Sequence, residues 1–235
     1  MIIEQQSFGR QGLTKSGIDP SFPHLNISDY FQFPDPLATN NDIVAVGGNL
    51  SPGMLVSAYK QGIFPWFNEG DPILWHSPDP RFILMPQNLH ISASMKKVLK
   101  QQVFDVRFDT DFYGVISACA QVKREGQRGT WITNDMIDAY CALHKLGIAH
   151  SAESYKDNVL VGGCYGILIN KIFFGESMFA KVSNASKAAF LSYAQQLFAA
   201  GILFIDCQVH TDHMESLGGI EVAKKDFIKM ISRQI

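Results

Sequence analysis

The chain has 235 residues, of which 46% are hydrophobic and 18% charged, with a formal net charge of −2 at pH 7, as is typical of a soluble globular enzyme. This charge argues against a protein that coats nucleic acid indiscriminately. No apolar run reaches the roughly 18 residues of a membrane span, and residues 1–6 lack the basic start and apolar core of a secretory signal. We therefore expect a cytoplasmic protein that makes no membrane contact.

Four cysteines lie in apolar stretches without C-x-x-C spacing: Cys119, Cys141, Cys164 and Cys207. This spacing indicates reduced core thiols rather than a disulfide framework or a zinc site. The histidines are scattered, and residues 210–213 offer two metal ligands at best. We therefore expect no metal and no cofactor.

The first third of the chain changes character near residue 33. Residues 1–32 are polar and irregular, which indicates a loosely held N-terminal extension. Residues 33–80 are expected to form a small α/β domain that begins with a strand at 43–46. Ser51 and Pro52 then have the residue types of an N-cap and a first helical position, and Gly62 is expected to end that helix.

Two aromatic, proline-containing segments follow, at residues 63–67 and 72–81. Both are too interrupted by proline for long regular elements. Their tryptophans have flat faces, so the segments either wall a joint between two domains or provide a stacking surface for a base.

Residues 81–235 are expected to form a larger catalytic domain. It begins with a strand at 82–85 and a basic helix at 95–100, capped by Ser92 or Ser94. A half-exposed strand at 103–108 follows. Two further helices are expected, one over 112–122 and one from the cap residue Thr133 to Gly147. Residues 93–131 carry seven basic and four acidic side chains, which is the local charge that docking a phosphate backbone requires.

The chain then predicts a sheet. Strand-like runs at 149–155, 159–169 and 172–179 are joined by short Asp-Asn and Asn-Lys turns, which predicts an antiparallel meander. A helix at 183–200 separates this meander from a strand at 202–209. A strand, a crossover helix and a strand make the two strands parallel. One helical turn at 213–217 and an amphipathic helix at 224–231 complete the chain.

Parallel strands end at the same edge of a sheet, so Glu176, Asp206 and Gln208 are expected to meet there. Side-chain alternation places Asp206 and Gln208 on one face and Cys207 on the other. A buried acid beside a buried amide is either a satisfied core network or a reaction centre. As a reaction centre it suits attack of an amine on an activated ester, which needs positioning and proton management.

Other kinds of site have weaker support. Ser177 is not in the G-x-S-x-G context of a hydrolase nucleophile, and neither a P-loop nor a G-x-G-x-x-G fingerprint is present. The helix that opens near Ser183 has a serine in capping position and a nearby lysine. It is either a phosphate site or an ordinary capped helix.

Six motifs resemble the leucyl/phenylalanyl-tRNA–protein transferase family. They are Gly-Ile-Phe-Pro-Trp-Phe (62–67), Trp-His-Ser-Pro-Asp-Pro-Arg (75–81), Gly-Thr-Trp-Ile-Thr (129–133), Phe-Gly-Glu-Ser-Met-Phe (174–179), Asn-Ala-Ser-Lys (184–187) and Asp-Cys-Gln-Val (206–209). The resemblance implies a GNAT-like acyltransferase fold for the C-terminal domain. It also implies transfer of Leu, Phe or Met from aminoacyl-tRNA to proteins that begin with Arg or Lys, which creates a degradation signal.

The resemblance also implies roles for individual residues. Asp206 and Gln208 match the catalytic pair, and Glu176 matches the acceptor-binding position. Trp66 and Trp131 are implied to hold the terminal adenosine. The contact to the rest of the tRNA is implied for Lys96, Lys97 and Lys100. The pocket for the transferred side chain is implied for Cys164, Phe173 and Met178. Whether Asp206 and Gln208 accept a proton or only position the amine stays open.

This sequence departs from the family's pattern at four positions. His76 stands where a second Trp is frequent, Ala93 where an Arg occurs in the basic helix, Cys164 where a larger Met can occur, and Gly219 where Ala occurs. Without the Arg, the three lysines of residues 96–100 are left to form the tRNA patch.

Two rival functions make different predictions. An acyl-CoA-dependent GNAT acetyltransferase predicts a glycine-rich pyrophosphate loop before the helix at 183–200, and residues 182–185 do not supply one. A non-catalytic adaptor for basic N-termini would tolerate the loss of Asp206 and Gln208. A monomer is expected, because the sequence contains no heptad pattern.

Overall fold

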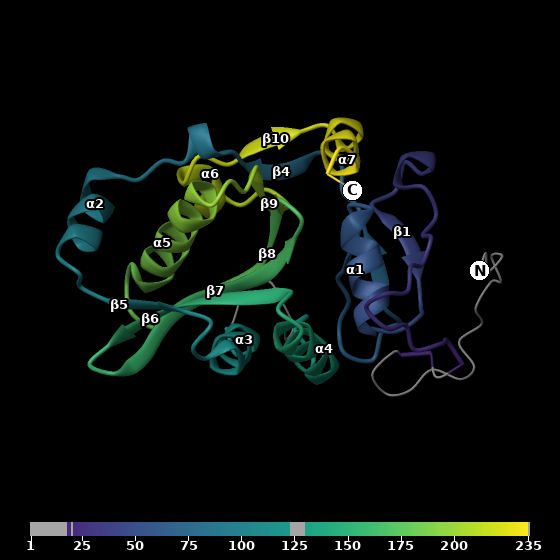
Figure 1. Cartoon of the computed structure of the whole chain (residues 1–235), viewed down its shortest axis with the longest axis horizontal. Coiled ribbons are helices and arrows are strands. Elements are labelled where there is room, and N and C mark those ends of the chain that lie inside the picture. The colour runs from purple at the N-terminus through teal and green to yellow at the C-terminus, as the bar shows by residue number, and fades with distance from the viewer. Residues whose placement is uncertain (1–17, 20, 123–129, 235) are drawn as a thin grey trace. The chain divides into compact units, whose positions relative to one another are not determined.

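The structure is a computed structural model that describes residues 18–19, 21–122 and 130–234 (Figure 1). The chain forms two compact units. The first contains the described residues of 1–79, 123–142 and 223–235, and the second contains residues 80–122 and 143–222. Both contain helices and strands, which confirms the expected mixed α/β class. The expected division at residue 80 stays a prediction.

The first unit is built on a small antiparallel sheet. Its strands, in the spatial order β1-β3-β2, are β1 (Ile43–Val46), β3 (Leu74–His76) and β2 (Phe64–Pro65). Trp75 on β3 is buried, and its indole Nε1 donates to the carbonyl of Gly47 at 2.8 Å. The two aromatic segments that proline interrupts thus contribute one short strand each.

Helices complete this unit: η1 (Pro36–Ala38), α1 (Pro52–Lys60), α7 (Lys224–Ser232) and residues 134–142 of α4 (Asn134–Lys145). The hydroxyls of Tyr59 on α1 and Tyr140 on α4 are 2.5 Å apart in the buried interior. Gly62 follows α1 with a φ of +75°, and a Cβ there would collide with Ile228 of α7. The predicted helix stop at Gly62 is therefore confirmed, and it also permits close packing of α7.

The described residues preceding β1 are not loosely held, which corrects one sequence expectation. The N–H of Leu25 donates to Ser51 Oγ at 3.1 Å, and the N–H of Phe31 donates to Ser57 Oγ at 2.9 Å. Ser51 occupies the N-cap position of α1 as predicted, but makes no side-chain cap bond. Its hydroxyl instead binds this preceding segment to the helix.

The second unit contains a seven-stranded sheet in the spatial order β10-β4-β9-β8-β7-β6-β5. The strands are β4 (Arg81–Leu84), β5 (Asp105–Phe108), β6 (Ala149–Lys156), β7 (Val159–Ile169), β8 (Ile172–Ala180), β9 (Phe204–Gln208) and β10 (Ile220–Val222). The β6-β7-β8 meander is antiparallel and β8 pairs with β9 in parallel, so both predictions are confirmed. The edge strand β10 was not predicted, because three residues carry too little pattern.

Helices lie on both faces of this sheet (Figure 1). They are η2 (Pro86–Asn88), α2 (Ala93–Lys100), α3 (Phe112–Ala120), α5 (Ala185–Ala199) and α6 (Asp212–Ser216). Phe190 and Leu191 of α5 join Leu84, Cys164 and others in one apolar cluster of buried residues. On the other face, a Cβ at Gly163 would meet Val115 of α3. Because α5 crosses one face, it connects β8 to β9 in the parallel sense.

Helix caps were predicted with mixed success. Ser92 Oγ accepts from the Met95 N–H, and Thr133 Oγ1 accepts from the Met136 N–H, as expected. The serine cap predicted for α5 is wrong, because its N-cap is Asn184, which has a φ of +68° and no side-chain cap bond. No helix in the described part of the chain is long and apolar enough to cross a membrane.

Candidate active site

The parallel strands β8 and β9 carry the predicted acid–amide constellation. Their pairing runs from Ile172↔Phe204 to Phe174↔Asp206. Beyond it the strands are linked by side chains, since Gln208 Nε2 donates to Glu176 Oε1 at 2.7 Å. Both residues are 8% exposed. The convergence of Glu176 and Gln208 at the end of the parallel pair, predicted from topology, is therefore present.

Two β-bulges direct these side chains toward each other. In β8, Ser177 pairs with Tyr165 and Gly175 pairs with Gly166, so Glu176 is the extra residue. A bulge of this kind bends a strand and turns the side chain that it carries.

The second bulge lies in β9. Gln208 pairs with Phe82 and Asp206 with Ile83, which leaves Cys207 as the extra residue. The bulged strand ends in a γ-turn, because the N–H of Val209 donates to the carbonyl of Cys207 at 2.8 Å while Gln208 has a φ of +64°. A γ-turn with positive φ is rare and strained for a residue other than glycine. Such strain costs of the order of 1–3 kcal/mol and persists only where surrounding contacts impose it.

Asp206 supplies one of those contacts. Its Oδ1 accepts the backbone N–H of Gln208 at 2.9 Å. Asp206 therefore holds the backbone of Gln208, whereas Glu176 fixes its side-chain amide.

Arg81 holds Asp206 from the other side. The guanidinium Nε donates to Asp206 Oδ1 at 2.8 Å and its NH2 group donates to Oδ2 at 2.6 Å, with both side chains completely buried. A two-bond pair of this kind fixes orientation as well as charge. Sequence reasoning missed Arg81. The signal was a lone arginine that opens the apolar run Arg-Phe-Ile-Leu.

The three residues implied for the aminoacyl pocket lie on the α5 side of the sheet. Cys164 and Met178 are cross-strand partners on β7 and β8, and Phe173 makes an edge-to-face contact with Tyr193 of α5 at 5.2 Å. Cys164 and Phe173 are buried in the apolar cluster that α5 contributes to, and Met178 packs against it. Burial raises the pKa of the Cys164 thiol, so this side chain is a neutral apolar group.

The tryptophans predicted to hold adenosine belong to the first unit. Trp66 is 37% exposed, and its carbonyl lies 3.0 Å from the Nε2 of His76. The two rings are tilted, with centroids 5.6 Å apart. Burial lowers the pKa of His76, so its ring is neutral near pH 7 and presents an aromatic face. Trp131 is buried, at 8% exposure.

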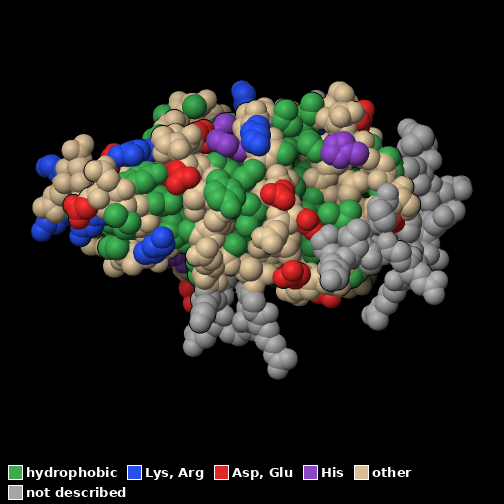
Figure 2. Space-filling view, turned by 90° about the horizontal axis from the view of Figure 1, so that it is seen from below, with side chains coloured by type: hydrophobic (Ala, Val, Ile, Leu, Met, Phe, Trp, Pro, Cys, Tyr) green, Lys and Arg blue, Asp and Glu red, His purple; other side chains and the backbone are tan. Residues whose placement is uncertain are grey.

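The three lysines of α2 are exposed in the second unit. In Figure 2, basic side chains gather at the left end of the view, where Figure 1 places α2 and β5. Lys123, Arg124 and Arg128, which also contributed to the predicted basic patch, lie outside the described residues.

One candidate metal cluster occurs among the described residues. Ligand atoms of His210, Asp212 and Glu215 lie within 4.8 Å of one another, and all three residues are exposed. His210 Nε2 and Glu215 Oε2 are already 3.1 Å apart, as in a surface ion pair. We assign no metal to this cluster.

The four cysteines are free thiols, as predicted. Burial raises the pKa of Cys207, and the neighbouring Asp206 raises it further. Neither Cys164 nor Cys207 is therefore activated as a nucleophile.

Comparisons with known proteins define the class. The family model described as leucyl/phenylalanyl-tRNA protein transferase matches residues 83–232, and the model of that family's N-terminal domain matches residues 48–79. The transferase named for this activity in Flavobacterium johnsoniae is 52% identical over 203 residues, covering 86% of this chain and 96% of its own. Its counterpart in Saccharophagus degradans is 53% identical over 195 residues, covering 83% and 80%.

Likeness to solved structures is weaker. A GCN5-related N-acetyltransferase from Kribbella flavida has 11% identity and a TM-score of 0.36, covering 74% of this chain and 62% of that one. This score adds nothing to the strand order already described. The sequence relationships define the chain as a transferase. It belongs to the leucyl/phenylalanyl-tRNA protein transferase family.

Proposed function

We propose that the chain transfers Leu, Phe or Met from aminoacyl-tRNA to the N-terminal Arg or Lys of acceptor proteins, which forms a peptide bond and a degradation signal in the cytoplasm. The observation that carries this proposal is the buried Glu176–Gln208 pair at the end of the parallel strands. Family membership supplies the reaction class.

The amide of Gln208 has a defined orientation. A carboxylate can only accept hydrogen bonds, so the NH2 end of Gln208 faces Glu176 and its Oε1 faces away. This oxygen is the group that accepts an N–H of the incoming α-amine. The amine lone pair is then directed at the ester carbonyl of the aminoacyl-tRNA.

Asp206 acts through its neighbours. It is completely buried, and both carboxylate oxygens accept hydrogen bonds from Arg81 or from Gln208. A substrate amine cannot reach it without displacing these groups. The sequence left open whether Asp206 accepts a proton or only positions the amine. This geometry favours the positioning role.

The chemical step balances without a cofactor. The amine nitrogen bonds to the carbonyl carbon, the tetrahedral intermediate collapses, and the bond to the 3′ oxygen of the tRNA breaks. That oxygen leaves with the proton that the amine loses. An amide does not accept a proton at neutral pH, so Gln208 positions the amine, while the departing ribose oxygen takes the proton.

Glu176 is proposed to select the acceptor. Its carboxylate holds Gln208 at 2.7 Å and brings a negative charge next to the amine site. A cationic Arg or Lys side chain is favoured beside this charge. Charge-assisted hydrogen bonds contribute about 1.5–3 kcal/mol, which is enough to distinguish Arg from Ala.

The apolar residues Cys164, Phe173 and Met178 are proposed to line the pocket for the transferred side chain. A methylene difference in such a pocket changes binding by only about 1–3 kcal/mol. Leu, Phe and Met are therefore all accepted. A β-branched side chain is expected to be rejected by its shape near the carbonyl.

Trp66 and Trp131 are proposed to stack on the terminal adenosine, and Lys96, Lys97 and Lys100 to contact the tRNA backbone.

The proposed domain boundary at residue 80 is supported by the two family models, one ending at residue 79 and the other beginning at residue 83. We propose a monomer in which residues 33–80 form the smaller domain and residues 81–235 the GNAT-like catalytic domain.

Transfer of labelled leucine from leucyl-tRNA to a peptide that begins with Arg tests this proposal, with the same peptide beginning with Ala as control. Label on the Arg peptide alone is the expected result. No label on either peptide, from folded protein and intact leucyl-tRNA, would favour a non-catalytic adaptor that binds basic N-termini.

A further inference from the structure

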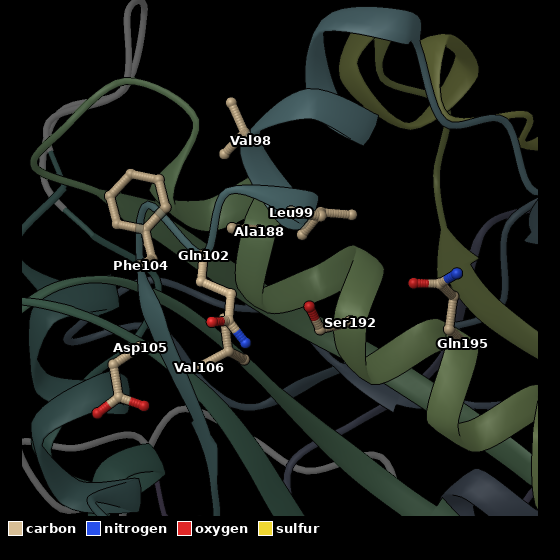
Figure 3. Close-up of a pocket in the computed structure, with 9 residues that line it drawn as sticks. All are labelled: Val98, Leu99, Gln102, Phe104, Asp105, Val106, Ala188, Ser192 and Gln195. Atoms are coloured by element: carbon tan, nitrogen blue, oxygen red, sulfur yellow. The ribbon is translucent and has the colours of Figure 1, made fainter.

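A cavity of about 480 Å³ lies in the second unit, lined by residues of α2, α5, β5 and the chain between α2 and β5 (Figure 3). Its lining combines two kinds of side chain. Leu99, Phe104 and Ala188 are apolar, whereas Gln102, Ser192 and Gln195 carry amides or a hydroxyl. None of these residues has a role in the reaction proposed above.

The sequence explains why the space exists. Ala188, Ser192 and Gln195 have the i, i+4, i+7 spacing that places them on one face of α5. Ala188 and Ser192 are small, so they leave room between α5 and α2. Gln102 has a φ of +48°, which turns the chain after α2 and brings its amide to the cavity. In Figure 3 the polar ends of Gln102 and Ser192 lie on facing elements.

The lining selects for a neutral ligand. Its one ionisable side chain, Asp105, is paired with Arg107, whose NH2 group lies 2.6 Å from Asp105 Oδ2. No lysine, arginine or histidine belongs to the lining. A phosphate or carboxylate would therefore find no cation inside. Two amides and a hydroxyl between apolar walls match a flat group with polar edges, such as a nucleobase.

The charge outside the cavity is different. Residues 93–108 carry four cations against one carboxylate. Lys96, Lys97 and Lys100 are exposed on α2, which also contributes Val98 and Leu99 to the cavity. A nucleotide chain that crosses α2 would thus meet lysines with its phosphates while a base enters the cavity. Phosphate contacts position the nucleic acid, and contacts to a base edge add selectivity.

We propose that the cavity between α2 and α5 binds one unpaired nucleobase of the tRNA donor, at a distance from the aminoacyl end. The base packs against Leu99 and Phe104 and hydrogen-bonds with Gln102, Ser192 and Gln195. This inference rests on the proposed function, since it assumes that the RNA ligand is tRNA. It assigns a second RNA contact to the catalytic unit.

Ser192→Phe tests the cavity directly, because Ser192 is half-buried in the lining and a phenyl ring would fill the space. Gln196→Phe, at an exposed position on the same helix outside the lining, is the matched control. Loss of one stacked base is expected to raise the Kd of uncharged tRNA about tenfold in Ser192→Phe. Gln196→Phe should bind tRNA like the wild type. Leucyl-adenosine, which lacks the rest of the tRNA, should serve both variants equally well as a donor.

A second variant avoids dependence on the folding of Ser192→Phe. Gln102→Asn shortens the amide, and asparagine tolerates the left-handed backbone at this position. It should also weaken tRNA binding, though less than filling the cavity does. Ultraviolet cross-linking of the wild-type protein to tRNA should place an adduct on the peptide that contains Phe104.

Three results would overturn the proposal. The first is an unchanged tRNA Kd in folded Ser192→Phe, together with no adduct within residues 98–106 or 185–199. The second is a raised KM for the acceptor peptide instead, which would make the cavity a protein-binding site. The third is wild-type protein that binds no tRNA but still transfers leucine from leucyl-adenosine, which would leave the proposed reaction standing. Tight tRNA binding that Ser192→Phe weakens, in a protein that transfers no leucine, would support the cavity proposal and overturn the proposed function.

Discussion

Arg81 and Asp206 lie 125 residues apart in the sequence and form a completely buried pair, joined by two hydrogen bonds of 2.8 and 2.6 Å. Asp206 in turn holds the backbone of Gln208. The pair therefore links β4 to the strained turn that carries the proposed amine-binding amide. Its contribution is structural and acts on the reaction through Gln208.

Breaking this pair is expected to destabilise the protein strongly. Arg81→Met leaves Asp206 as a buried carboxylate without its cation, and loss of one partner of a buried pair costs about 3–5 kcal/mol. Urea unfolding followed by circular dichroism should show this fall in the free energy of unfolding. Arg107→Met, which removes an exposed cation from its pair with Asp105, should cost less than about 1 kcal/mol. Equal losses in the two variants would contradict the account.

The pairing with Arg81 limits what a substitution of Asp206 can reveal about its role in the reaction. Asp206→Ala would leave the Arg81 guanidinium buried and uncompensated, so loss of activity in that variant does not identify a proton acceptor. The double variant Arg81→Met with Asp206→Leu removes both charges. It should recover part of the stability lost in either single variant but transfer leucine slowly, since Gln208 is then no longer held.

The strain at Gln208 makes a separate prediction. Gln208→Gly removes the side chain from a position with a φ of +64°, where a non-glycine residue costs of the order of 1–3 kcal/mol. It also loses the bond to Glu176. We expect a free energy of unfolding within about 1 kcal/mol of the wild type, because the two effects offset each other. Gln208→Ala keeps the strain and loses the bond, so it should be less stable than Gln208→Gly. The reverse order in thermal denaturation would argue against a strained turn.

Acceptor choice should depend on the charge of Glu176. Glu176→Gln keeps an acceptor oxygen for Gln208 but removes the negative charge. The kcat/KM for an Arg peptide is expected to fall about 10- to 100-fold, in line with loss of a charge-assisted hydrogen bond. The low value for an Ala peptide should change little. Glu221→Gln, at an exposed site on β10, is the control. An unchanged Arg-to-Ala ratio in Glu176→Gln would mean that another group reads the acceptor.

Stability should fall in acid partly through Asp109. Burial raises the pKa of Asp109, but hydrogen bonds from the His150 ring and the Ser151 N–H, together with the charges of His150 and His144, outweigh this effect and lower the pKa overall. A carboxyl whose pKa is lower in the folded state stabilises the protein above its unfolded-state pKa, near 3.9. This contribution is lost as the pH falls through the folded-state value. Asp109→Asn should therefore be less stable than the wild type at pH 6, with a difference that shrinks below about pH 4. A constant difference in urea unfolding across this range would contradict the assignment.

Much of the second unit followed from local patterns. The meander, the crossover helix and the parallel pair β8–β9 were predicted because each has a strong periodicity and a short turn. The convergence of Glu176 and Gln208 then followed from topology alone. Arg81 could not be predicted as a partner, because nothing local specifies which of many residues lies beside a buried Asp206.

The finer geometry was also beyond the sequence. A bulge is one extra residue on one strand of a pair, so its position depends on the partner strand. The positions of the extra residues Glu176 and Cys207 are therefore set by the pairing with β7 and β4. The γ-turn at Gln208 requires a positive φ, whereas glutamine prefers a negative φ, so only tertiary contacts impose this conformation. The α2–α5 cavity likewise results from small residues on one helix that face another.

The measurement that tests the central claim most directly is the single-turnover rate of peptide-bond formation with saturating leucyl-tRNA and Arg peptide. If the amide of Gln208 positions the attacking amine, Gln208→Ala should lower this rate at least about 100-fold. The Kd for leucyl-tRNA should stay that of the wild type. A folded Gln208→Ala protein that transfers leucine at the wild-type rate would contradict the claim.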